Sequence, residues 1–159
     1  MVAIENWVFL VYRVPREPST PRISVWRKLK RLGVAQVGDG LVALPYDAST
    51  KERLEWIAHD ITEVGGDATI WITTPGIRRF GRSLAESLAS ERAAEYREVC
   101  GQVAASVGLG QVDRSRALRR LRAEYRRIER RDYFPPAEKA DAREALDRLA
   151  AGLELAVTP

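Results

Sequence analysis

Residues 7–14, WVFLVYRV, decide the fold class, because they are apolar on both alternating faces until Arg13. β-branched and aromatic residues favour strands, and a strand that is apolar on both faces is typical of the covered centre of a sheet. Pro15 and Pro18 follow directly and end the extended segment. The stretch therefore predicts a central, buried strand.

The segment after this strand predicts an amphipathic helix that ends at Gly33. Thr20 is a suitable N-cap, and Pro21 suits the first helical position. The residues expected on its apolar face are Val25, Trp26, Leu29 and Leu32.

Three further strands and a second helix complete the pattern. Residues 34–37 and 41–44 flank Gly38-Asp39-Gly40, a tight-turn signal for a hairpin. Ser49 and Glu52 form a capping box at the start of the second helix, and residues 68–73 (ATIWIT) are the last strand. The order predicts an α+β fold, a ferredoxin-like βαββαβ sandwich with both helices on one face of a four-stranded antiparallel sheet.

The remainder of the chain predicts an all-helical extension of about three helices. Ser83 and Glu86 form a capping box for the first, and Asp113 can cap the second. The expected inner faces hold Leu88, Tyr96, Val99, Val103, Leu118, Leu121, Tyr125, Ile128, Leu146, Leu149 and Leu153. We expect a ferredoxin-like domain at residues 1–76 and an arginine-rich helical extension at residues 77–159, packed on that domain.

The first strand poses a packing problem, because two helices cover only one face of a sheet. Either Trp7, Phe9 and Val11 or Val8, Leu10 and Tyr12 must point away from both helices. Leaving three such side chains in water would forgo about 1.5–3 kcal/mol each. We expect either the C-terminal helices or a second copy of the chain to cover that face.

The position of each tryptophan in its predicted strand or helix indicates whether it is buried. Trp26 falls on the apolar face of its helix, and Trp7 and Trp71 fall in strands, so we expect these three in the core. Trp56 lies one step off the apolar stripe of the second helix and is a candidate for contact with the C-terminal helices or a partner.

The net charge of +4 is unevenly distributed along the 159 residues. Residues 1–75 carry nine basic and nine acidic side chains, whereas residues 76–134 carry fourteen arginines against eight acidic side chains. A basic segment attached to a neutral domain favours a polyanionic partner. The alternative is a solvated helix surface in an arginine-rich protein.

Candidate binding residues lie in two basic stretches, one around the first helix and one in the arginine-rich helix. Arginine binds phosphate and other oxyanions through paired hydrogen bonds, and basic contacts to phosphate dominate non-specific nucleic-acid affinity. The candidate residues for nucleic-acid or anion binding are Arg16, Arg22, Arg27, Lys28, Lys30, Arg31, Arg119, Arg120, Arg122, Arg126, Arg127 and Arg130.

Signatures of catalysis, cofactors and metals are missing from the sequence. His59 is the one histidine and Cys100 the one cysteine, too few for a metal site built on these ligands. Glu91, Glu95 and Glu98 lie at helical spacing, and we interpret them, with the interleaved Arg92 and Arg97, as a salt-bridged solvent face rather than a metal cluster. We therefore predict a non-enzymatic protein with no catalytic residue, metal or cofactor.

The sequence also bears on location. No apolar run reaches the roughly 18–20 residues needed to span a bilayer, and the N-terminus has no secretory signal pattern. A single cysteine cannot form an internal disulfide. We expect a cytoplasmic protein without a membrane partner.

Several blocks together resemble one known family. They are WVFLVYRVP at 7–15, RISVWRKLKRLG at 22–33, DGLVALP at 39–45, GGDA at 65–68 and RRDYFP at 130–135. In this order they resemble the N-terminal domain of the chromate-resistance regulator ChrB. The resemblance implies a regulatory, DNA-associated domain. In that family a chromate-sensing half follows, and we expect a separate chromate-sensing chain as a partner.

The element order is also similar to the Cas2-type ferredoxin fold and to the middle domain of PaaX-type repressors. Cas2-type nucleases place a metal-binding aspartate directly after the tyrosine of the first strand. Here Arg13 follows Tyr12, and a cation cannot hold a metal ion. The likeness therefore implies sheet-mediated dimerisation and nucleic-acid affinity rather than nuclease activity.

Together these observations predict a homodimeric domain for DNA-binding transcriptional regulation linked to chromate resistance. The alternative is a protein-interaction or oxyanion-binding module without direct DNA binding, in which the arginines hold a partner or a tetrahedral anion such as chromate.

Overall fold

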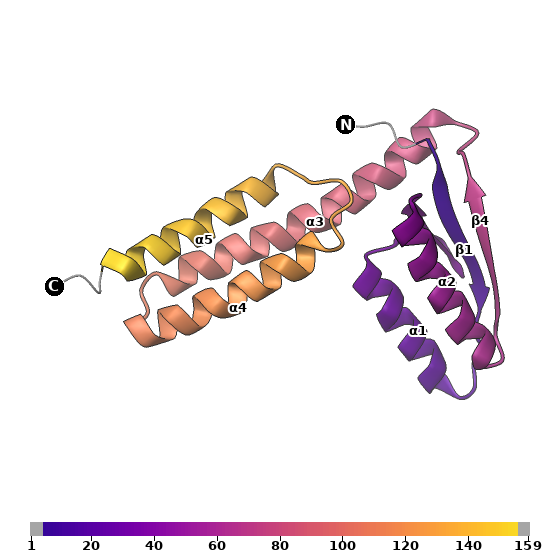
Figure 1. The fold of residues 1–159 in the computed structure, drawn as a ribbon, viewed down its shortest axis with the longest axis horizontal. Coiled ribbons are helices and arrows are strands. Elements are labelled where there is room, and N and C mark those ends of the chain that lie inside the picture. Colours follow the sequence, from indigo (N-terminus) through magenta and orange to yellow (C-terminus); the bar gives the residue numbers. More distant parts are fainter. Residues whose placement is uncertain (1–4, 156–159) are drawn as a thin grey trace. The chain divides into compact units, whose positions relative to one another are not determined.

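The computed structural model describes residues 5–155, which form two compact units divided after Leu88 (Figure 1). The long helix α3 runs across the division. In chain order the elements are β1 (Trp7–Arg13), α1 (Ser19–Leu32), β2 (Ala35–Gly38), β3 (Leu41–Pro45), α2 (Ala48–Glu63), β4 (Asp67–Thr73), α3 (Arg78–Ser106), α4 (Gln111–Glu129) and α5 (Glu138–Leu155).

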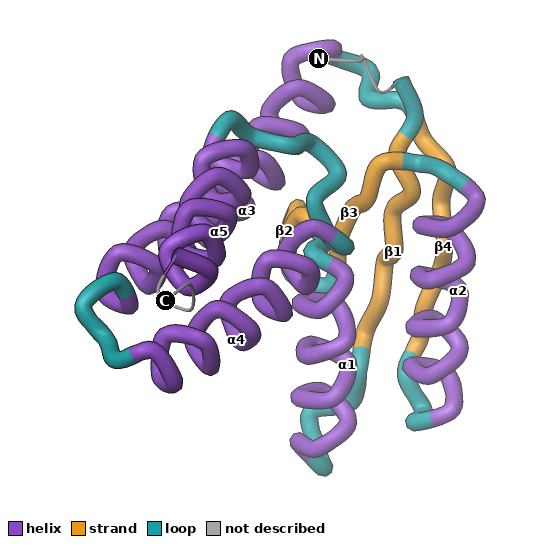
Figure 2. Tube along the Cα trace, turned by 60° about the vertical axis from the view of Figure 1, so that its left-hand side comes forward, coloured by secondary structure: helices purple, strands orange, loops and turns teal. Residues whose placement is uncertain are grey.

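The first unit is a four-stranded antiparallel sheet in the order β2-β3-β1-β4. β1 is central, and its Trp7 lies opposite Pro45 of β3 on one side and Thr73 of β4 on the other. Helices α1 and α2 both lie on one face of this sheet (Figure 2). The α+β, ferredoxin-like prediction with a helical extension is confirmed.

The face of the sheet beneath α1 and α2 is a closed hydrophobic core. Val8 and Leu10 of β1 have no exposed surface, and neither do Val42 and Leu44 of β3. The buried residues that the two helices contribute are Val25, Leu29, Leu54, Ile57 and Ile61. Alternation along β1 therefore places Trp7, Phe9 and Val11 on the opposite face.

Among the described residues of the first unit, the start of α3 covers one end of that opposite face. Trp7 is fully buried, and Gly81 of α3 lies so close that an added Cβ would be 3.3 Å from the Trp7 Nε1 atom. Farther along, Val11 is 45% exposed and Trp71 of β4 is 59% exposed. The core prediction is confirmed for Trp7 and is wrong for Trp71.

Helix starts differ from the predictions where two capping residues compete. The N-cap of α2 is Asp47, whose carboxylate accepts from the Thr50 N–H at 2.7 Å, while the Thr50 hydroxyl oxygen accepts from the Asp47 N–H at 3.0 Å. The Thr50 hydroxyl also donates to the Pro45 carbonyl, which favours this cap over Ser49. α1 begins at Ser19 without a side-chain cap, so Thr20 is not its N-cap.

The two other predicted starts also lie inside their helices. α3 begins at Arg78, so the Ser83 pattern falls within it. α4 begins after Gly110, which leaves Asp113 in the first turn.

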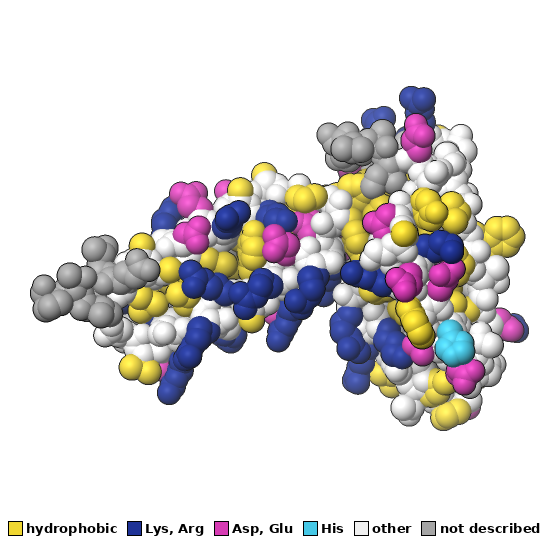
Figure 3. All heavy atoms as spheres, viewed as in Figure 1, with side chains coloured by type: hydrophobic (Ala, Val, Ile, Leu, Met, Phe, Trp, Pro, Cys, Tyr) yellow, Lys and Arg dark blue, Asp and Glu magenta, His cyan; other side chains and the backbone are white. Residues whose placement is uncertain are grey.

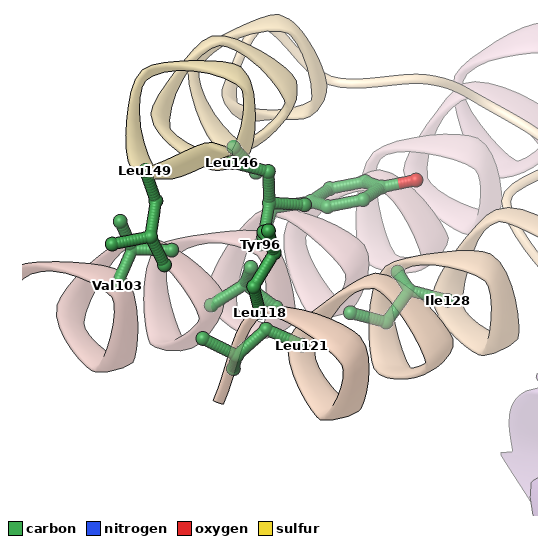
Figure 4. Close-up of a cluster of buried hydrophobic side chains, with 9 residues drawn as sticks. Tyr96, Val103, Leu118, Leu121, Ile128, Leu146 and Leu149 are labelled. Carbon is green, nitrogen blue, oxygen red and sulfur yellow. The ribbon is translucent and has the colours of Figure 1, made fainter. Parts of the chain in front are cut away.

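The second unit has its own hydrophobic core between three helices (Figure 4). Tyr96, Val99 and Val103 come from α3, and the partners from α4 and α5 are Leu118, Leu121, Ile128, Ala142, Leu146 and Leu149. Tyr125 and Leu153 are partly buried against this cluster. The predicted inner faces are confirmed.

Candidate nucleic-acid interface

Helix α1 carries an exposed basic face. The helix contains five basic side chains and no acidic one. Because Val25 and Leu29 point into the core, the residues on the other side of the helix face solvent. We call this surface the α1 face; its exposed members are Arg22, Ile23, Trp26, Arg27, Lys30 and Arg31. Figure 3 shows dark blue side chains gathered over α1.

Trp26 belongs to the α1 face and not to the core. Its side chain is 56% exposed, and the Lys30 Nζ atom lies 5.7 Å from the centre of its ring. The core prediction for Trp26 is therefore wrong, and Trp26 is a binding candidate that the sequence reasoning missed. The available signal was spacing, because Arg22 and Lys30 lie four residues to either side of Trp26 on the same helix face.

The cations of helix α1 differ in whether an acidic side chain pairs with them. Lys28 is half-buried and pairs with Asp60 of α2 at 2.5 Å, so it joins the two helices. Among the side chains described, those of residues 5–153, no acidic one forms an ion pair with Arg22, Arg27 or Arg31. These three charges are therefore available to a ligand, whereas Lys28 is already compensated.

The start of α1 adds to this positive region. Arg16 is exposed in the loop before the helix, and the first turn holds no acidic side chain. The N-cap residue is Pro18, whose side chain cannot accept a hydrogen bond from the first backbone N–H groups. The helix dipole at this end therefore adds to the charge of Arg16 and Arg22.

Helix α4 carries the second basic surface, in the other unit. Its buried residues Ala117, Leu118, Leu121 and Ile128 leave the intervening arginines in solvent. The exposed predicted residues are Arg119, Arg120, Arg122, Arg126, Arg127 and Arg130. Of these, Arg127 pairs with Glu124 at 3.0 Å, and no other ion pair to this set forms in the described part of the chain.

A buried polar cluster lies beside the core of the second unit and has a structural role. Arg92 is only 4% exposed and pairs with Glu95 at 2.9 Å, which in turn pairs with Arg131 at 2.7 Å. The Tyr96 hydroxyl donates to Asp132 at 2.9 Å, whose side chain has no exposed surface. The prediction of a salt-bridged solvent face is therefore wrong for Arg92, whereas Arg97 is exposed and pairs with Glu138 at 2.6 Å as such a face requires.

This cluster has one titration consequence. Burial and the bond to Asp132 raise the pKa of Tyr96 well above its ordinary value. The hydroxyl therefore stays protonated and keeps donating to the carboxylate, which holds Asp132 of the RRDYFP block between α4 and α5.

The one histidine lies on α2, whereas the basic surfaces lie on α1 and α4. His59 lies on the exposed side of α2, where it lines a shallow depression with Glu52, Glu55 and Trp56. No group of three or more His, Cys, Asp or Glu side chains in residues 5–153, the side chains that the structure describes, could hold a metal ion. Among the helices described, none is long and apolar enough to cross a membrane.

Comparison with known proteins agrees with the family suggested by the sequence blocks. The solved structure of the uncharacterized protein Rv0674 from Mycobacterium tuberculosis matches 95% of this chain and 61% of its own, with a TM-score of 0.56 and 14% identity, which shows a shared fold. Protein ChrB of Cupriavidus metallidurans is 25% identical over 157 residues. That alignment covers 96% of this chain and 48% of the relative, so the chain spans about half the length of this curated relative.

The family model described as "Protein ChrB, N-terminal" matches residues 22–108, which is more than half of the chain. That range includes all of α1 after its first turn and the whole of α3. The chain therefore belongs to the ChrB N-terminal family.

Proposed function

We propose that this chain is a DNA-binding domain of a transcription regulator linked to chromate resistance, and that the α1 face contacts the DNA. The observation that carries the proposal is the set of exposed cations on α1 without acidic neighbours on that helix. Opposite charges four residues apart stabilise a surface helix, and α1 has no such pair within itself.

The α1 face suits the backbone of a nucleic acid rather than a neutral ligand. Arg27 and Arg31 lie one turn apart and can each offer paired N–H donors to a phosphate. Arg22, Trp26 and Lys30 form a second row beside them, in which the aromatic ring adds a flat contact surface. Phosphate contacts of this kind position a protein on DNA without specifying a sequence.

A salt titration of binding tests the proposal. We would measure the dissociation constant for a labelled duplex over a range of salt concentrations, for the natural chain and for the triple variant Arg22→Ala, Arg27→Ala, Arg31→Ala. Removing one phosphate contact should reduce the slope of log affinity against log salt by about 1. The triple variant should therefore bind more weakly and with a flatter slope.

The matched control removes the same number of charges elsewhere. Arg53 on α2 and Arg143 and Arg148 on α5 are all exposed, so their triple alanine variant changes net charge equally. This control should keep the slope of the natural chain. If both triple variants reduce affinity equally, binding follows net charge alone and the α1 face has no special role. Absence of binding to any duplex at low salt would refute the proposal.

A second candidate function is oxyanion or partner-protein binding by α4. Its support is that Arg119, Arg122 and Arg126 are exposed, without an acidic partner among the described residues. Calorimetric titration with chromate, and with sulfate as a matched tetrahedral anion, tests whether α4 binds a small oxyanion. Heat of binding that disappears in an Arg122→Ala, Arg126→Ala variant would support it, and no heat with either anion would remove it.

A further inference from the structure

The two edges of the sheet differ in how they are protected from other strands. β2, at one edge, is four residues long, and its pairing with β3 shifts register between Gln36 and Gly38. Short length and irregularity are common ways to prevent an edge from pairing with another chain. β4, at the other edge, is seven residues long and pairs regularly with β1 along its whole length. The β4 edge therefore lacks these protections.

The composition of β4 makes this edge unusually open to pairing. Between Asp67 and Thr73 the strand reads ATIWI, which contains no proline and no charged residue to prevent association. Trp71 and Ile72 point to opposite faces of the sheet, and they are 59% and 49% exposed. Both faces of the edge thus present large apolar side chains to solvent, an arrangement that favours a protein contact.

The pattern of side chains along β4 fits a second copy of the same strand. If two β4 strands pair antiparallel about a two-fold axis at Ile70, Thr69 lies opposite Trp71 of the other copy, and Ala68 lies opposite Ile72. Each large side chain then meets a small one, on both faces of the sheet. Asp67 lies opposite Thr73, so no like charges meet.

We propose that β4 is a homodimer interface in which two copies pair edge to edge about Ile70. Such a contact is isologous, as expected for a two-fold dimer, and it joins the two sheets into one of eight strands. The two-fold axis stands perpendicular to the sheet, so the α1 and α2 layers of both copies lie on the same side. The dimer therefore presents two α1 faces toward one side, although the proposal does not depend on their binding DNA.

Sedimentation of the full chain, without nucleic acid, tests the interface. The natural chain should sediment at micromolar concentrations with twice the chain mass of 17.9 kDa. Trp71→Lys places a charge on the edge and should halve the observed mass. Trp56→Lys is the matched control, because Trp56 is 65% exposed but lies on α2, and this variant should remain a dimer. Circular dichroism would verify that both variants keep the helical content of the natural chain.

A cysteine cross-link tests the register independently of any destabilising charge. In a Cys100→Ser background, Ile70→Cys places one cysteine of each copy directly opposite the other across the two-fold axis. Oxidation should then yield a covalent dimer. Ala68→Cys is on the same face but should not cross-link, because the two copies of residue 68 would lie about 14 Å apart at 3.4 Å per residue.

The outcomes separate the alternatives. A monomer at every concentration would overturn the proposal, as would a Trp71→Lys variant that remains a dimer. A natural dimer that becomes a monomer in the Trp56→Lys variant would place the interface on the helix layer instead. Cross-linking of Ala68→Cys but not of Ile70→Cys would also reject the proposed register.

Discussion

Trp7 and Trp26 have the same side chain in opposite environments, and the consequences can be measured. Trp7 is fully buried, so Trp7→Ala should lower the free energy of unfolding by about 3–5 kcal/mol. Trp26 is more than half exposed, so Trp26→Ala should change it by no more than about 0.5 kcal/mol. Urea denaturation followed by circular dichroism measures both.

The same Trp26→Ala variant also tests the α1 face. If the ring stacks on a nucleic acid, its removal should weaken binding by about 1–3 kcal/mol, the range measured for aromatic stacking on bases. Trp56→Ala, another exposed tryptophan in the same unit, is the control and should leave affinity unchanged. A large decrease in the stability of Trp26→Ala would contradict its exposed position.

Tyr96 gives a prediction for alkaline pH. Its pKa is raised above the ordinary value of 10.0, chiefly by burial and then by the bond to Asp132. Below pH 10 the hydroxyl is protonated in both states, and its full contribution is present. Above that pH only the unfolded chain releases the proton, so the free energy of unfolding should fall as pH rises.

Two variants separate the causes of this decline. Tyr96→Phe removes the titrating group. The free energy of unfolding, measured across about pH 9–11, should therefore decline less steeply with pH, by an amount that corresponds to the release of at most about one proton. At neutral pH the same variant should cost about 1–3 kcal/mol, because the buried carboxylate of Asp132 no longer has its donor. Asp132→Asn keeps an acceptor and the burial, so it should reduce the decline only in part. An unchanged slope in Tyr96→Phe would show that Tyr96 does not titrate differently in the two states.

At the scale of elements, the charges on α1 that would favour DNA binding also reduce the stability of the helix. Arg27 and Arg31 are one turn apart with like charge, which destabilises a helix slightly. Arg27→Glu would place an acidic side chain four residues before Arg31, a favourable order that contributes about 0.2–0.5 kcal/mol. The variant should therefore be as stable as the natural chain or more so, yet bind duplex DNA more weakly at low salt.

The Arg27→Glu variant distinguishes a surface that binds DNA from one that is only exposed to solvent. Thermal unfolding gives the stability, and fluorescence anisotropy with a labelled duplex gives the affinity. Arg53→Glu on α2 is the charge-matched control, and it should keep affinity closer to that of the natural chain. Equal decreases in the two variants would argue that α1 has no special role.

The sequence predicted the elements and their order well, because periodicity reports which residues are buried. The apolar stripes of α3, α4 and α5 identified their buried faces. Residues 7–14 are apolar on both faces, so they predicted a central strand without showing which face α1 and α2 cover. Helix starts were harder, because Asp47 and Ser49 are both good N-caps, and the hydrogen bond from Thr50 to the Pro45 carbonyl at the end of β3 favours Asp47. Trp26 and Trp71 were misplaced because hydrophobicity alone does not tell whether a neighbour exists to cover them.

The sequence alone could only partly show which candidate residues are exposed and unpaired and which are held by other side chains. Periodicity correctly placed Arg27 and Arg31 on the outer side of α1. It could not show that Lys28 pairs with Asp60, because these residues are 32 positions apart and come together only when α1 packs beside α2. It also could not identify Arg92 as buried, since the Arg131 carbonyl that it contacts lies in another segment.

For the whole molecule, the division into two units predicts separable unfolding. Each unit has its own buried core, one beneath α1 and α2 and the other between three helices. All four tryptophans, Trp7, Trp26, Trp56 and Trp71, lie in the first unit. Tryptophan fluorescence therefore reports on the first unit alone, whereas far-ultraviolet circular dichroism reports on both.

A core substitution in the second unit should uncouple these two signals. Leu121 is 1% exposed in the three-helix core, so Leu121→Ala should destabilise that unit by about 2–5 kcal/mol. In urea, the circular dichroism signal should then begin to fall before the tryptophan signal changes, because the helices of the second unit melt first. Leu54→Ala in α2, a fully buried position of the first unit, is the matched control and should move the tryptophan transition instead. If both variants shift both signals together, the continuous helix α3 couples the two units into one cooperative structure.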